Sequence, residues 1–467
     1  MKVCNKLPKT AEAGQNTIQK KRKLRAEHIF ALGFLSIILI GALLLMLPAA
    51  SNAGTVTPFS DTLFTAVSAT CVTGLVVVDT GTHWSLFGQC VILCMIQIGG
   101  LGFMSFALFL LGAAGRRVSP KFRTMTAQSF GLDFGAGIHT FVKRIFIGTA
   151  VIEGCGAILL MLRTVPMLGV GRGVFAGIFL SVSAFCNAGF DPFGGVCAEP
   201  FASLLPFGVD GLLLGVLSAL IILGAAGFLV WNDLWERIRY GKRLGMYSRF
   251  ILTVTGCLLA GGTVLVAVLE WNNPETIGSL SVPQKLLHAF FQSVTPRTAG
   301  FDAIGQTAMR DATKVISMIL MFVGGASGST AGGAKVGTVG VMLVSVWATL
   351  RGRRDIRVMK RTMPMDVVSR AMCILFIMLA VIFASSVLLV LMEGVTMEAA
   401  LYECFSAFCT VGLSLSLTPT LGIGGRILLM IAMYAGRVGI LTLSYVLLHR
   451  DDDEDALRYP PAKILIG

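Results

Sequence analysis

Charged residues and histidine are both scarce in this 467-residue sequence. Charged residues make up 13% of the chain and the mean hydropathy is +0.80, whereas a soluble protein carries about 25% charged residues. The five histidines lack the spacing of metal ligands, and the eleven cysteines include no C-x-x-C pair, so we read them as buried, unreactive thiols. These shortages exclude a soluble enzyme, a disulfide-rich secreted protein and a disordered chain. They indicate a polytopic membrane protein.

Acidic residues are also few, with 25 Asp and Glu against 38 Lys and Arg. Of the basic residues, 29 lie in every second connection between apolar segments, including eight in residues 1–28 and seven in residues 348–370. This positive-inside pattern predicts that both ends of the chain are cytoplasmic. The basic stretches are then topology signals that contact membrane lipids, and nucleic-acid binding is not expected.

Apolar segments that approach the length of a membrane span occur eight times. A helix needs about 20 apolar residues to cross a bilayer, and the first run, from Ile29 to Leu47, has 19. We therefore expect a retained helix there instead of a cleaved signal peptide. The expected spans are 29–48, 89–112, 143–164, 209–231, 248–270, 313–347, 369–393 and 424–449.

Two glycine landmarks recur four times along the chain. The first ends a short amphipathic stretch, at spacings of 115, 111 and 112 residues, and falls at Gly74, Gly189, Gly300 and Gly412. The second ends a Gly-x-x-Gly marker and falls at Gly102, Gly227, Gly328 and Gly439. Helix packing through small residues is the simplest interpretation of the second landmark. Each unit therefore reads as helix, half-helix, glycine-containing return and helix.

The sequence thus predicts an all-α polytopic membrane protein with eight transmembrane helices, in which four tandem repeats surround a pseudo-fourfold pore. We expect the repeats at 29–118, 139–235, 246–350 and 366–449. They lie between a basic cytoplasmic N-terminus at 1–28 and a cytoplasmic C-terminus at 450–467.

The glycine-containing returns have the properties of an ion-selectivity filter. Non-helical backbone at membrane depth is tolerated where it lines a water-filled cavity. A half-helix of about 12 residues is about 18 Å long, so it brings the negative end of its dipole to the middle of the bilayer. Glycine accepts the positive φ that turns a carbonyl toward the axis, and rings of carbonyls can bind a dehydrated cation. The expected filter residues are Val72, Thr73, Gly74, Asn187, Ala188, Gly189, Thr298, Ala299, Gly300, Thr410, Val411 and Gly412.

These motifs resemble those of the superfamily of potassium transporters that includes the Ktr, Trk and plant HKT proteins. The resemblance extends over residues 29–449 and depends on the segments 73–75, 97–103, 187–190, 297–301 and 410–414. Because only a short polar segment precedes the first unit, the chain is most similar to the membrane subunit of a Ktr system. The resemblance implies potassium uptake across the bacterial cell membrane by a homodimer, with a ring of cytosolic nucleotide-binding regulatory subunits. It implies potassium as the substrate, because a serine at the first filter glycine accompanies sodium preference. No covalent cofactor is expected, and sodium is a candidate activating ion.

Residues 324–335 are unusual for a membrane span, because they contain five glycines and no large apolar residue. Each glycine lowers helix stability by about 1 kcal/mol relative to alanine, which predicts a break. In the resembled family this segment is the intramembrane gate. We expect Lys335 to meet an acid near the cytoplasmic mouth. The expected gate residues are Gly324, Gly325, Ser327, Gly328, Ser329, Thr330, Gly332, Gly333, Lys335 and Arg437.

Two arginines are expected at membrane depth. A charge there costs ~2.5–3.5 kcal/mol on insertion scales, so Arg437 should face the bundle interior. An internal ion pair is one reading, and the resemblance implies the other, a cation beside the ion path that restrains ion passage. Arg297 should point away from the axis, toward Asp302 or another acid.

Two rival functions differ from potassium uptake through a pore. One is a sodium-preferring HKT-like transporter. The other is an alternating-access secondary transporter, although such proteins usually show twofold inverted repeats, whereas four units in the same direction favour a pore. A membrane enzyme is disfavoured, because no Ser/His/Asp or His/acid constellation converges on one face.

Overall fold

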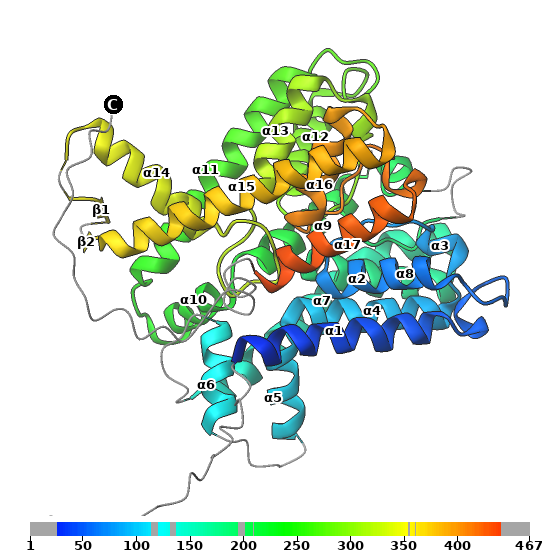
Figure 1. The fold of residues 1–467 in the computed structure, drawn as a ribbon, viewed down its shortest axis with the longest axis horizontal. Helices are drawn as coiled ribbons and strands as arrows, with labels where there is room; N and C mark the ends of the chain where they lie inside the picture. Colours follow the sequence, from blue (N-terminus) through cyan, green and yellow to red (C-terminus); the bar gives the residue numbers. More distant parts are fainter. Residues whose placement is uncertain are drawn as a thin grey trace, which may run out of the picture.

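The structure is a computed structural model that describes residues 26–113, 120–130, 137–194, 201–208, 210–353, 355–359 and 361–439. The regular secondary structure of the described chain is almost entirely helical (Figure 1), as the composition predicts. The predictions for residues 1–25 and 440–467, which include the cytoplasmic termini, lie outside the described residues.

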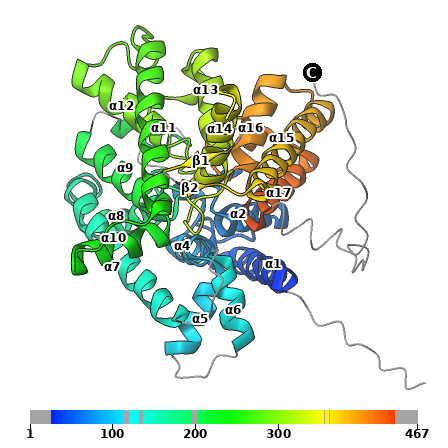
Figure 2. The same ribbon diagram turned by 90° about the vertical axis from the view of Figure 1, so that its left-hand side faces the viewer.

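Four groups of packed helices form the body of the molecule. Each group begins with a long apolar helix, and these are α1 (Ala26–Leu45), α7 (Ile138–Leu168), α11 (Met246–Glu270) and α15 (Met365–Glu393). A short helix follows and packs on it: α2 (Phe59–Cys71), α8 (Val170–Cys186), α12 (Val282–Val294) and α16 (Met397–Phe408). The last members are α4 (Leu86–Leu101), α9 (Gly211–Ala225), α13 (Asp311–Phe322) and α17 (Ile423–Val438). The groups follow one another around the centre, from blue through green to orange (Figure 2).

Local sequence signals account for where these helices begin. The Asp210 carboxylate accepts hydrogen bonds from the amides of Leu212 and Leu213 at 3.0 and 3.1 Å, which caps α9. Ser281 and Gln284 form a capping box at the start of α12. These caps satisfy part of the set of free amides at each helix N-terminus and so favour helix starts at these residues.

The expected straight spans 89–112 and 209–231 are both broken, which corrects the prediction. Helix α4 bends by 97° into α5 (Phe103–Ala113), and α9 bends by 99° into α10 (Phe228–Tyr240). The breaks fall at Gly102 and Gly227, whose φ angles are +86° and +90°. A left-handed residue ends the helix, so the second glycine landmark breaks helices.

Two further spans also differ from their expected extent. The span expected at 313–347 is interrupted between α13 and α14 (Val336–Leu350), where a break was predicted. Helix α17 ends at Val438, and Gly439 has a φ of +91°. The part of that expected span beyond residue 439 lies outside the described residues.

Shorter elements complete the described chain. The remaining helices are α3 (Thr80–His83) and α6 (Pro120–Ser129), with 3-10 turns at Pro48–Ala50, Leu205–Phe207, Gln306–Ala308 and Thr418–Thr420. The strands β1 (Arg357–Val358) and β2 (Arg361–Thr362) pair antiparallel beyond α14.

Within the described residues, three helices are long and apolar enough to cross a membrane: α7, α11 and α15. Counting each bent pair as one span raises the number to five. The apolar part of helix α1, Ala31–Leu45, is shorter than the length that such a span requires.

Candidate functional site

Four non-helical segments follow the short helices, and each contains a left-handed pair of residues. The four landmark glycines have φ angles of +95°, +70°, +81° and +98° at Gly74, Gly189, Gly300 and Gly412. The residue two positions earlier is also left-handed in every case, with φ between +52° and +74° at Val72, Asn187, Thr298 and Thr410. Positive φ at a β-branched residue is a strained conformation that clusters at functional sites.

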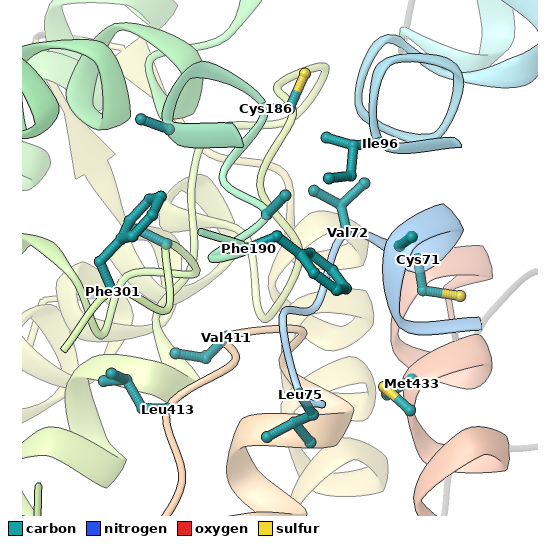
Figure 3. Close-up of a cluster of buried hydrophobic side chains, with 14 of the residues drawn as sticks. Cys71, Val72, Leu75, Ile96, Cys186, Phe190, Phe301, Val411, Leu413 and Met433 are labelled. Carbon is teal, nitrogen blue, oxygen red and sulfur yellow. The ribbon is translucent and has the colours of Figure 1, made fainter. Parts of the chain in front are cut away.

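The four segments meet in a closed ring. A Cβ added to Gly74 would lie 2.5 Å from the carbonyl oxygen of Ala188, and one added to Gly189 would lie 2.8 Å from that of Ala299. In the same way, Gly300 abuts the Val411 carbonyl and Gly412 abuts the Thr73 carbonyl. Each segment therefore contacts the next, and the fourth contacts the first. Figure 3 shows these segments converging around Val72, Phe190, Phe301 and Val411.

Hydroxyl groups at the end of each short helix hold the ring segments in place. The Ser68 carbonyl accepts from the Thr73 amide at 2.8 Å, and its hydroxyl accepts from the Gly74 amide at 3.1 Å. Ser406 does the same for Val411 and Gly412, at 2.8 and 3.0 Å.

Two further hydroxyls bind the second and third ring segments, at the residue that follows each landmark glycine. The hydroxyl of Ser183 donates to the Phe190 carbonyl, and that of Thr295 donates to the Phe301 carbonyl, both at 2.7 Å. Our sequence reasoning missed these four residues. Three of them stand six positions before their glycine, so aligning the repeats on that glycine would have revealed them.

Several buried polar atoms in the ring have no protein partner in the part of the chain that the structure describes. They are the hydroxyls of Thr73, Thr298 and Thr410 and both polar atoms of the Asn187 amide. Buried polar groups are normally hydrogen-bonded, so each of these needs an explanation. The ring is therefore a place where a ligand or ordered water would find hydrogen-bonding groups.

The first glycine of three of the four Gly-x-x-Gly markers packs against the end of a short helix, whereas Gly325 of the third marker contacts Ala331 and the Ala225 carbonyl. A Cβ on Gly99, Gly224 or Gly436 would overlap the carbonyl oxygen of Thr70, Phe185 or Phe408, respectively. These carbonyls lie at the ends of α2, α8 and α16. The marker therefore has two roles, because its first glycine allows close packing and its last glycine breaks the helix.

Residues 324–335 form a compact loop whose two ends are joined. The Gly324 amide donates to the Ala334 carbonyl, and the Val336 amide donates to the Gly325 carbonyl, both at 2.9 Å. The hydroxyl of Ser329 donates to the Ala326 carbonyl at 2.6 Å. We call residues 324–335 the glycine loop. It interrupts the helix as the sequence predicts.

The glycine loop is bound to the bend between α9 and α10. The Ala326 amide donates to the Ala225 carbonyl at 2.9 Å, and the Phe228 amide donates to the Gly328 carbonyl at 2.8 Å. The Thr330 amide donates to the Gly224 carbonyl at 3.4 Å, and its hydroxyl donates to the Phe185 carbonyl at 3.1 Å. Of the other predicted loop residues, Gly332 lies against Thr410 of the ring.

Arg437 lies in the last turn of α17 and binds backbone carbonyls. Its guanidinium donates to Thr330 at 2.5 Å, to Gly100 at 3.2 Å and to Gly99. No acid pairs with it among the described residues, so the internal ion pair is not observed in that part of the chain. The contacts link α4, α17 and the glycine loop.

Arg437 and Lys335 both line a cavity of about 480 Å³ beside the glycine loop. The Lys335 ammonium donates to the Ala331 carbonyl at 2.6 Å and meets no acid in the described chain, contrary to the prediction. The loop backbone satisfies it locally, which removes the need for a distant carboxylate. No acidic residue is among the described residues that line the cavity.

Arg297 also differs from its prediction. Its guanidinium donates to the Gly324 carbonyl at 3.5 Å, so it reaches toward the glycine loop. Asp302 does not bind it, because that carboxylate already accepts from the amides of Ile304, Gly305 and Gln306.

Two other acids lie near the ring segments. Glu153 of α7 accepts from the Gln97 amide at 3.1 Å. Glu403 of α16 is fully buried and accepts from the hydroxyls of Ser414 and Thr418, so it faces protein.

One acid stands beyond the ring on the connection to α9. Asp191 follows Gly189 by two residues, and the Phe193 amide donates to it at 3.2 Å. Burial raises the pKa of Asp191 to about 6, although the hydrogen bond from Phe193 lowers it, and the neighbouring Asp79 carboxylate raises it further. This group therefore changes charge just below neutral pH.

A family model described as "TrkH: Cation transport protein" matches residues 18–454. This chain belongs to the TrkH family of cation transport proteins. A Ktr system potassium uptake protein B from Bacillus subtilis is 37% identical over 97% of this chain and all of its own length. The "Potassium/sodium uptake protein NtpJ" from Enterococcus hirae is 38% identical over 97% of this chain and all of its own length.

A solved structure supports the fold. The potassium transporter TrkH from Vibrio parahaemolyticus superposes with a TM-score of 0.66 at 18% identity, covering 91% of this chain and 86% of that one. The family and this fold agree with the resemblance drawn from the sequence.

Proposed function

We propose that this chain takes up potassium across the cell membrane through the ring formed by its four glycine segments. The observation that supports this most directly is closure of the ring, in which Gly74, Gly189, Gly300 and Gly412 each abut a carbonyl of the next segment. Such a ring surrounds one axis, and left-handed residues turn carbonyls toward it. The chain is then a four-repeat, pseudo-fourfold pore with eight transmembrane helices.

The short helices add favourable electrostatics to the ring. Each of α2, α8, α12 and α16 ends immediately before its ring segment, so its C-terminal carbonyls face the ring. A helix C-terminus carries roughly −0.5 charge, so four of them favour a cation at the centre. The unpartnered hydroxyls of Thr298 and Thr410 would coordinate it on one side of the glycines.

The glycine loop is the gate in this proposal. It lies against Thr410 at Gly332 and against the cavity at Lys335, so an ion leaving the ring meets it. Arg437 holds it through Thr330, and removal of that contact frees the loop to move. Nucleotide-binding regulatory subunits in the cytosol would control this movement, because relatives are named as parts of Ktr systems.

Membrane lipids and a second copy of this chain are the other proposed partners. The protein is then an inner-membrane homodimer with cytoplasmic termini. Potassium is the substrate, and sodium is a candidate activating ion.

The test is uptake of rubidium or potassium into liposomes that contain the purified chain, with and without its regulatory subunits. Uptake that saturates with potassium and is weakly inhibited by sodium supports the proposal. Equal or preferred uptake of sodium would instead support the sodium-transporting alternative, for which the name of the Enterococcus hirae relative is the specific observation. Uptake that requires a counter-transported ion would favour alternating access.

A further inference from the structure

The exposed surface of α10 has the composition of a helix that lies at a membrane surface. Trp235 and Ile238 are 57% and 82% exposed and share one face of the helix, as does the exposed Arg239. Tyr240 at the end of the helix is 64% exposed. Trp and Tyr beside basic residues are typical of the interface between lipid headgroups and acyl chains.

The net charge of this surface is positive because its two acids, Asp233 and Glu236, already have partners and are outnumbered by basic residues. The Asp233 carboxylate accepts from the Ser248 hydroxyl at 2.5 Å and from the Gly245 amide at 3.3 Å. Glu236 pairs with Lys242 at 2.9 Å. Three exposed arginines remain without an acid partner in the described chain: Arg237, Arg239 and Arg243.

The bend at Gly227 gives α10 the right direction for such a role. Because α10 leaves α9 at 99°, a membrane-crossing α9 puts α10 nearly parallel to the membrane plane. The positive-inside pattern puts it on the cytoplasmic side. Helix α5 is a useful contrast, because it leaves α4 at a similar 97° but carries no charged residue from Phe103 to Ala113. The basic surface is therefore specific to α10, and it is not shared by the helix that follows the other bend.

The first residues of α10 are joined to the glycine loop. The Phe228 amide donates to the Gly328 carbonyl at 2.8 Å, and Ala326 is bonded to Ala225 just before the bend. From α11, which packs on α10, the Tyr247 hydroxyl also donates to the Ser327 carbonyl, at 3.5 Å. A rotation of α10 about Gly227 would strain these bonds and move the loop.

We propose that α10 binds anionic phospholipid headgroups at the cytoplasmic surface and that this binding holds the glycine loop in the arrangement seen here. The arginines bind lipid phosphates, and Trp235 and Ile238 enter the acyl boundary. The inference rests on the proposed function, because it assigns a lipid regulator to the proposed gate. Anionic lipid then slows uptake, since the bound α10 keeps the loop beneath the ring.

The test compares initial rubidium uptake by the full-length chain in phosphatidylcholine vesicles and in vesicles with about 30 mol% phosphatidylglycerol. The variant is Arg237→Gln/Arg239→Gln/Arg243→Gln, and the matched control is Arg353→Gln/Arg357→Gln/Arg361→Gln, which removes three exposed charges beyond α14. We expect phosphatidylglycerol to slow the wild type and the control by about threefold and to leave the α10 variant unchanged. Choline chloride at about 1 M, which shortens the Debye length to about 3 Å, should weaken the effect.

A second measurement keeps the proposal testable if the triple variant folds poorly. Brominated phosphatidylglycerol should quench tryptophan emission more than brominated phosphatidylcholine, and Trp235→Phe should remove that difference. Equal quenching by both lipids, or uptake in every variant that is indifferent to phosphatidylglycerol, would overturn the proposal. So would a variant whose defect appears only when regulatory subunits are added, because α10 would then bind a protein partner. Absence of uptake in all vesicles would instead count against the proposed function.

Discussion

Replacing Arg437 with glutamine should accelerate uptake, because it removes a fixed positive charge from the cavity beside the proposed ion path. Two unit charges about 6 Å apart at an effective dielectric constant of about 20 repel by about 2.8 kcal/mol. At about 1.36 kcal/mol per tenfold change, this sets a ceiling of about a hundredfold on the rate. Arg437 is only partly buried, so water in the cavity reduces the repulsion. We expect about a tenfold increase in the initial rate.

The same substitution also loosens the glycine loop. Arg437 donates to the carbonyls of Thr330, Gly99 and Gly100, and a hydrogen bond from a charged group contributes about 1.5–3 kcal/mol. Arg437→Lys separates the two effects, because it keeps the charge but cannot reach all three carbonyls. A slow Arg437→Lys together with a fast Arg437→Gln would identify the charge as the barrier.

The assay is initial rubidium uptake in liposomes, normalised to the amount of reconstituted protein. Arg426→Gln is a matched control on the same helix, because it removes an arginine that pairs with Asp61 at 2.6 Å, far along α17 from Arg437. It should lower stability without raising the rate. If Arg437→Gln is well folded and transports at or below the wild-type rate, the electrostatic reasoning is refuted.

Four other predictions follow from the site. Gly74→Ser places a side chain against the Ala188 carbonyl, so potassium over sodium selectivity in competition uptake should fall, and an unchanged ratio would contradict the assignment of Gly74 to the filter. Deleting residues 326–333 joins ends that are already hydrogen-bonded, so the shortened protein should transport faster and largely without its regulatory subunits; wild-type rates with full dependence would show that the loop is no gate. Asp191 is charged above its pKa of about 6 and neutral below it, so the KM for potassium should rise as external pH falls through 6, and Asp191→Asn should abolish that dependence. Ser406→Ala removes the hydroxyl that binds the Gly412 amide, at a cost of about 1–3 kcal/mol, so selectivity should fall while membrane insertion is retained; unaltered selectivity would indicate that other bonds suffice.

The helical class and the positions of the ring glycines could be predicted from sequence, because both depend on local composition and a period. Gly74 and its counterparts follow short helices closely. In an apolar chain, this recurring pattern indicates a return of the backbone after a half-helix. The bends at Gly102 and Gly227 could not be predicted, since a Gly-x-x-Gly marker is compatible with packing in a straight helix. Whether a glycine adopts positive φ depends on what its neighbours contact in three dimensions.

The partners of the buried cations were the least predictable part. Lys335 and Arg297 were expected to meet acids, and an ion pair was one of two readings of Arg437, because ion pairing is the usual way to accommodate a charge at membrane depth. Backbone carbonyls at broken helix ends can also accept hydrogen bonds from a buried cation. The sequence does not indicate where those helix ends meet. The structure shows that the broken backbone of the glycine loop and of α4 supplies these partners.

Thr330 is where the four groups of helices meet, and this explains how a small input could move the proposed gate. Its amide and hydroxyl bind Gly224 and Phe185 of the second group, and its carbonyl accepts from Arg437 of the fourth, which in turn binds Gly99 of the first. A neutral hydrogen bond contributes about 0.5–1.5 kcal/mol net and a charged one about twice that. The three bonds of Thr330 therefore total about 2.5–6 kcal/mol, and the upper end of that range reaches the value of about 5.5 kcal/mol that inverts a 1:99 equilibrium. A regulator that breaks only these contacts would thus shift the proposed gate from mostly closed to mostly open, without disturbing the ring that we propose as the selectivity filter.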